Sequence, residues 1–162
     1  MRWLAALLVL LAACAPVPGG ARAVIEPTGD MPISGFVDFE NVPGGVKVIA
    51  DLKGLPPGNH GFHIHEKGDC GNGGKAAGGH FNPDGVEHGA PTAMVRHVGD
   101  LGNVEALPDG SAKYDRIDDV IKFVGPHSLV GKAVVIHEKP DDFGQPTGNA
   151  GSRIACGVIH VK

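Results

Sequence analysis

The sequence has no excess of positive charge, no long apolar run and no internal repeat. Its 14 lysines and arginines are outnumbered by 18 aspartates and glutamates, which gives a formal net charge of −4. That balance gives no support for nucleic-acid binding or for electrostatic binding to an anionic membrane. The most apolar run, residues 3–11, is too short to span a bilayer as a helix. Without a repeat or a change in composition, a single domain is expected.

A sustained 3.6-residue apolar period is also absent, which argues against a helical fold. Short alternating segments are instead separated by many of the 26 glycines and 13 prolines. This pattern predicts an all-β fold, either an antiparallel sandwich or a flattened barrel. We expect strands at 33–39, 46–52, 61–65, 101–107, 111–117, 132–138 and 154–161. Two long connections, 66–100 and 139–152, are then left to carry function.

The N-terminus reads as an export signal. Arg2 precedes the apolar run, and Leu11-Ala12-Ala13-Cys14 resembles the bacterial lipobox, whose cysteine is lipidated before cleavage. We therefore predict a signal peptide at 1–13, a tether at 14–22, and one domain at 23–162 anchored through Cys14 to a membrane of the cell envelope. The alternative is an ordinary signal peptide with Cys14 incidental. Both alternatives place the mature chain outside the cytoplasm, in the periplasm or cell envelope.

Cysteine is scarce, with three residues in the chain. If Cys14 carries a lipid, Cys70 and Cys156 form an even pair in an oxidising compartment, where a disulfide is the default. Such a bond would tie the first long loop to the last strand. The alternative is two buried free thiols.

Histidine, by contrast, is concentrated: six of the nine histidines lie between His60 and Asp100. Packing gives no reason for this clustering, whereas histidine is the commonest metal ligand among side chains. His63 and His65 alternate with Phe62 and Ile64, so in a strand both imidazoles share one face while the apolar pair enters the core. A metal site is expected on that face.

A further imidazole, His137, closes a later strand just before the second long loop, and Arg153 follows that loop. His137 could meet the His63 and His65 pair if the two strands are neighbours in the sheet. Spacing alone does not determine whether they converge.

Five segments, in order, carry a family resemblance: HGFHIHEKGD, GGHFNP, RHVGDLGNV, VVIHEKPDD and GNAGSRIACGVI. Together they resemble the copper-zinc superoxide dismutase family, and the export signal suggests its bacterial lipoprotein type. The likeness covers nearly all of residues 23–161 and implies an eight-stranded antiparallel Greek-key flattened barrel. It further implies one copper and one zinc per chain, superoxide as the small anionic substrate, and either a monomer or a homodimer.

Carried over by position, the resemblance implies that copper is bound by His63, His65, His80 and His137. It implies that zinc is bound by His80, His88, His97 and Asp100. His80 would then bridge the two metals. Four imidazoles suit a tetragonal copper(II) centre, and three imidazoles with one carboxylate close a tetrahedral zinc site.

The resemblance also assigns roles beside the metals. Arg153 would attract and orient the anion at copper, and His80 would deliver a proton to it. Asp141 would accept hydrogen bonds from a copper histidine and from His88, with Asp142 as the rival for this role. The remaining histidines, His60, His127 and His160, match no ligand position. The alternative to catalysis is a copper or zinc binding or storage protein of the envelope.

Overall fold

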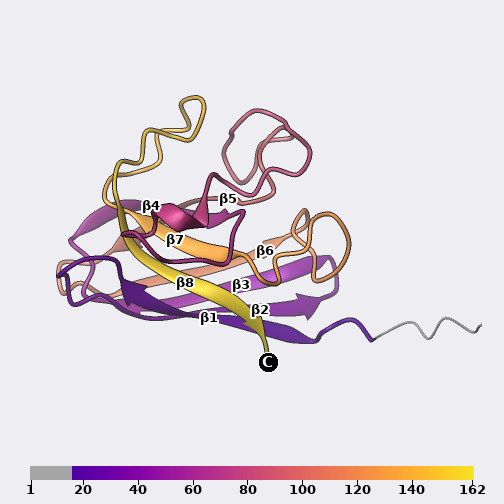
Figure 1. Ribbon diagram of the computed structural model, residues 1–162, viewed down its shortest axis with the longest axis horizontal. Helices are drawn as coiled ribbons and strands as arrows, with labels where there is room; N and C mark the ends of the chain where they lie inside the picture. Colours follow the sequence, from indigo (N-terminus) through magenta and orange to yellow (C-terminus); the bar gives the residue numbers. More distant parts are fainter. Residues whose placement is uncertain (1–15) are drawn as a thin grey trace, which may run out of the picture.

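The computed structural model describes residues 16–162 and shows an all-β barrel (Figure 1). Its strands are β1 (Gly20–Pro27), β2 (Ser34–Val42), β3 (Gly45–Lys53), β4 (Gly58–His65), β5 (Asp100–Ala106), β6 (Ala112–Asp118), β7 (Ala133–His137) and β8 (Arg153–Val161). The one helical turn in this part of the chain is the 3-10 helix η1 (Lys75–Ala77). The signal peptide and Cys14 lie outside the described residues.

The strands close into a barrel in the order β1-β2-β3-β6-β5-β4-β7-β8, and all neighbouring pairs are antiparallel. Two connections, β3 to β4 and β6 to β7, cross between strands that are not neighbours, which is the Greek-key arrangement. The predicted all-β, eight-stranded fold is confirmed. Within residues 16–162, no helix is long and apolar enough to cross a membrane.

The strand at Gly20–Pro27 was not predicted, and it begins inside the segment assigned to the tether. Its buried residues, Ala21, Ala23 and Ile25, alternate with exposed positions, and two of the three are small. β1 becomes a strand because it pairs with β2 on one side and with β8 on the other. This pairing closes the barrel.

The barrel core is formed by alternate residues of each strand. On β4, Phe62 and Ile64 are fully buried in this core, and Phe62 packs edge-on against Tyr114 with ring centroids 5.0 Å apart. The alternate residues His63 and His65 therefore project from the outer face, as predicted.

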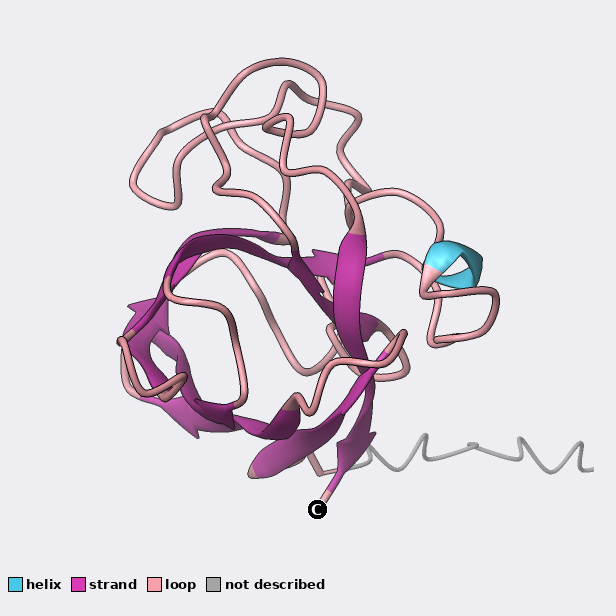
Figure 2. Cartoon of the chain, turned by 90° about the vertical axis from the view of Figure 1, so that its left-hand side faces the viewer, coloured by secondary structure: helices cyan, strands magenta, loops and turns pink. Residues whose placement is uncertain are grey.

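The two long loops lie over that outer face. Figure 2 shows the loops gathered on one side of the barrel, above the strands. The first loop is fastened by a disulfide between Cys70 and Cys156, whose Cα atoms lie 5.7 Å apart, within the usual range. Beneath the bond, Ala77 packs with Ala133 and Val135 of β7 in a small apolar cluster outside the barrel. The predicted disulfide is confirmed.

Candidate metal centre

Four neighbouring strands, in the order β5, β4, β7 and β8, carry part of the site, and the two long loops supply its remaining polar residues, His80, His88, His97 and Asp141. His63 of β4 pairs with Asp100, the first residue of β5, and on the other side with Val135 of β7. His137 lies two residues after Val135, so it points from the same face. His137 in turn pairs with Arg153 at the start of β8. The strand order thus brings together residues that are far apart in the sequence.

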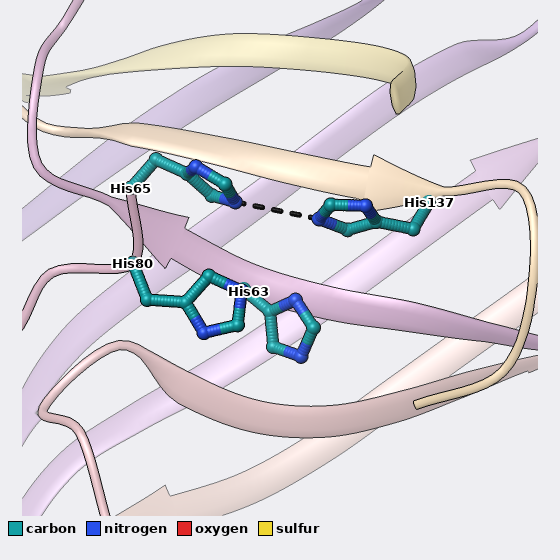
Figure 3. A group of neighbouring side chains, drawn as sticks. All are labelled: His63, His65, His80 and His137. Atoms are coloured by element: carbon teal, nitrogen blue, oxygen red, sulfur yellow. Dashed lines mark hydrogen bonds between the residues drawn. The ribbon is translucent and has the colours of Figure 1, made fainter. Parts of the chain in front are cut away.

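One group of buried ligand atoms is formed by imidazoles alone. It comprises His63, His65, His80 and His137, whose candidate atoms all lie within 4.8 Å of one another. Figure 3 shows these rings converging, with the two Nε2 atoms of His65 and His137 3.3 Å apart. His65 Nδ1 donates to the carbonyl of Gly78, which fixes the tautomer and leaves the Nε2 lone pair facing inward.

A second group combines three imidazoles with a carboxylate: His80, His88, His97 and Asp100. Asp100 Oδ1 lies 2.9 Å from His80 Nδ1 and 3.1 Å from His97 Nδ1. The Nδ1 atoms of His80 and His97 are 3.3 Å apart. His80 belongs to both groups, and because its Nδ1 is in the second, its Nε2 is left for the first.

These contacts fit cation binding better than they fit hydrogen bonding. Two nitrogens bound tetrahedrally to zinc at 2.0–2.1 Å lie about 3.3 Å apart, the spacing of His80 Nδ1 and His97 Nδ1. His63 Nδ1 and His88 Nδ1 are buried without a hydrogen-bond partner, although His88 Nδ1 is 2.9 Å from Asp100 Oδ2. Buried polar atoms that lack a partner are rare, so both groups suit metal ions.

The protonation states of the first group also suit metal binding. Burial lowers the pKa of His63 to about 4 and that of His137 to about 3, and it lowers the pKa of His65 well below its usual value. These imidazoles are therefore neutral at pH 7 and offer lone pairs. For His88, burial lowers the pKa, but the neighbouring carboxylates of Asp100 and Asp141 outweigh burial and raise the pKa to about 9. At pH 7 the His88 ring is therefore protonated, and its positive charge lies between the carboxylates of Asp100 and Asp141.

Asp141 links the two groups. Its Oδ2 accepts from His63 Nε2 at 2.9 Å, and its Oδ1 accepts from His88 Nε2 at 3.0 Å. Gly148, in the left-handed region at φ 74°, passes so close that a Cβ there would overlap the Asp141 carboxylate. Asp142, the alternative to Asp141 in the sequence, is exposed, and its carboxylate accepts hydrogen bonds only from Gly144 N and Asn149 Nδ2. The structure thus places Asp141, and not Asp142, between the two rings.

Arg153 lies beside the first group. Its guanidinium donates to the carbonyls of Gly74 and Gly78, and the Gly78 carbonyl also accepts from His65 Nδ1. Arg153 and His65 therefore share one acceptor. The side chain is only half-buried, which leaves the cation accessible to a small anion.

Known proteins with similar sequences identify the family. The family model of copper/zinc superoxide dismutase (SODC) matches residues 33–159, most of the chain. The chain belongs to the copper/zinc superoxide dismutase family.

Individual relatives agree with this result. The chain is 46% identical over 150 residues to the extracellular superoxide dismutase [Cu-Zn] of Caenorhabditis elegans, covering 86% of this chain and 68% of the relative. It is 49% identical over 134 residues to the enzyme of the same name from Haemonchus contortus, covering 78% and 73%. Among solved structures, the crystal structure of the clock protein EA4 is similar, with a TM-score of 0.86 and 44% identity, covering 94% of this chain and all of that chain.

Membership of the family confirms the predicted enzyme class and cofactors: the protein is a superoxide dismutase that uses one copper and one zinc. Every ligand position that the resemblance proposed falls in one of the two groups described above. The sequence predicted that His60 is structural or exposed, with a hydrogen bond to a loop carbonyl as a possible role beside the strand of His63 and His65. His60 matched no ligand position, yet it is 3% exposed and both its ring nitrogens contact backbone carbonyls.

Replacing Asp141 with alanine is expected to lower zinc affinity by about 10–100-fold, because His63 and His88 lose their shared acceptor. Retention of zinc against a graded chelator measures the effect. Asp142→Ala is the matched control, since that carboxylate reaches neither ring, and it should retain zinc like the wild type. Equal zinc loss in both variants would contradict the role of Asp141.

Proposed function

We propose that this enzyme binds copper through His63, His65, His80 and His137, and zinc through His80, His88, His97 and Asp100. The main support for this proposal is that His80 belongs to both buried groups, with one ring nitrogen for each. The all-imidazole group suits copper(II), and the group with one carboxylate suits zinc. Bound copper supplies reversible one-electron transfer, and bound zinc supplies fixed positive charge.

The protein's own groups handle the substrate and the protons. Dismutation converts two superoxide anions and two protons into dioxygen and hydrogen peroxide, so a proton donor is needed beside the anion. His80 Nε2 is proposed as that donor in the state in which it would carry a proton instead of binding copper, because it faces the first group from the shared ring. Arg153 orients the anion, since its planar guanidinium is fixed by two carbonyls next to His65.

The test is metal content together with dismutase activity. The exported protein, loaded with copper and zinc, should hold one of each and dismutate superoxide only when copper is present. Stoichiometric metal without dismutation would favour an envelope metal-storage protein instead.

The domain is proposed to be held in the cell envelope by a lipid on Cys14, as in bacterial lipoproteins, with 1–13 removed and the tether following. The extracellular relatives support export. The position of β1 is compatible with such an anchor. This strand has eight residues and extends about 26 Å, at 3.3 Å per residue, from Gly20 to its end near Thr28. Thr28 donates to the Arg153 carbonyl at 2.6 Å, so Gly20 and the Arg153 end of the metal centre lie at opposite ends of β1.

Replacing Cys14 with serine should therefore move the protein from the membrane fraction to the soluble fraction without changing its specific activity. The measurement is detergent-phase partitioning of cell envelopes, with metabolic labelling by a radioactive fatty acid. Identical partitioning and labelling of the two proteins would mean that Cys14 is not lipidated.

A further inference from the structure

His127 is a half-buried histidine that joins two loops and belongs to neither metal group. Its Nε2 lies 2.9 Å from Asp84 Oδ2 in the first long loop, and its Nδ1 lies 3.2 Å from the carbonyl oxygen of Val120, in the connection between β6 and β7. A carbonyl and an ionised carboxylate can only accept hydrogen bonds, so the ring makes both bonds only when both of its nitrogens are protonated. The contact with Asp84 is then an ion pair.

On the side of His127, the chain is fastened to the barrel. Ile121 and Leu129, which lie on either side of it in the same connection, are fully buried in the barrel core. Lys122 N donates to the His127 carbonyl at 3.0 Å, and Leu129 N donates to the Lys122 carbonyl at 2.9 Å. His127 is therefore carried by a well-anchored segment.

On the side of Asp84, the chain has no such support, because residues 83–87 are all exposed. Asn82 and Val86 exchange two hydrogen bonds, which close a turn with Asp84 at its centre. Among the described residues, the contact with His127 is the one hydrogen bond or ion pair that joins this turn to another part of the chain.

The turn matters because it lies between two proposed zinc ligands. Asp84 is four residues after His80 and four residues before His88. Because both of these histidines are buried, release of zinc requires this part of the loop to move outward. A contact that fastens the turn to the barrel should slow that movement.

We propose that His127 is a positioning residue for zinc: by pairing with Asp84, it fastens the turn between His80 and His88 to the barrel and slows the release of zinc. The inference rests on the proposed zinc ligands. Copper should respond less than zinc, because three of its four proposed ligands come from β4 and β7.

The fastening should weaken as the pH rises, because loss of either ring proton removes the positive charge and one of the two donated hydrogen bonds. Asp84 is the charged group that faces the ring from the first loop. In the connection that carries His127, Lys122 Nζ donates to the Asp119 carbonyl, and among the described residues neither side chain bonds to the ring. The proposed zinc ligands also titrate, so the effect is measured as a ratio of two proteins at each pH.

The test is the rate at which zinc passes to a chelator in Asp84→Asn, which keeps the shape of the side chain and removes its charge. We expect release about two- to fivefold faster than in the wild type at about pH 6, the effect of losing one partly exposed ion pair. The ratio should fall toward one at about pH 8.5, well above the range in which an imidazole usually carries a charge.

Glu87→Gln is the matched control. It removes one negative charge from the same exposed segment, and Glu87 forms no ion pair among the described residues. Any effect of the lost charge on zinc release should therefore be the same at every pH.

His127→Gln completes a double-mutant cycle, since an amide carries no charge. In that background Asp84→Asn should change the release rate little. Three results would overturn the proposal: equal release from Asp84→Asn and the wild type at the lower pH, a ratio that does not change with pH, or additive effects of the two substitutions.

If Asp84→Asn fails to fold, nitrogen NMR of the wild-type protein loaded with zinc decides. Protons on both ring nitrogens of His127 at the lower pH support the ion pair, and a singly protonated ring there refutes it. Failure of the zinc assignment itself is distinguishable, because His88→Ala would then keep its zinc.

Discussion

Replacement of His137 by alanine is expected to remove copper and dismutase activity while zinc stays bound. His137 contributes Nε2 to the all-imidazole group only, 3.3 Å from His65 Nε2. The loss of a proposed direct copper ligand should exceed the roughly 10–100-fold drop in affinity that follows loss of an outer-shell partner. The second group, which we propose binds zinc, keeps all four of its residues, and its carboxylate Asp100 pairs with β4 and not with β7. Metal analysis after dialysis, together with an activity assay, measures both effects.

The matched control is His160→Ala, an exposed histidine on the same barrel that should keep both metals and full activity. Parallel loss of copper and zinc in His137→Ala would contradict the division of the site into two groups. Retention of copper would contradict the ligand assignment itself.

Much of the fold followed from the sequence because its pattern was local. The alternation of Phe62 and Ile64 with His63 and His65 predicted both the strand and the direction of each side chain. β1 escaped prediction because Ala21 and Ala23 give a weak apolar signal, and the segment is a strand only through its pairing with β2 and β8.

The candidate site was predictable in composition but not in geometry. The histidine content suggested metal, whereas the meeting of His137 with the β4 pair depends on which strands become neighbours. The choice between Asp141 and Asp142 depends on how the second loop turns, which no spacing encodes. The place of His60 beside the β4 pair suggested contact with a loop carbonyl, but the sequence did not say which carbonyls, because backbone carbonyls have no sequence signature.

Replacement of Arg153 by alanine is expected to keep both metals and to slow dismutation about 100-fold, the typical cost of removing one donor that stabilises a developing anion. Arg153 makes no contact with the zinc group; it pairs with His137 across β7 and β8 and shares the Gly78 carbonyl with His65. The cation thus lies where an anion would approach the copper group. Measurement of kcat/KM by pulse radiolysis at several ionic strengths should show both a lower rate and a weaker salt dependence, because one attracting charge is gone.

Arg153→Lys separates charge from geometry. A lysine keeps the positive charge but lacks the planar fork that donates to Gly74 and Gly78 together, so the salt dependence should recover while the rate recovers only in part. Full recovery of the rate would mean that charge alone suffices and that the fixed orientation of the guanidinium is not used. An Arg153→Ala enzyme with the wild-type rate would remove this residue from the mechanism.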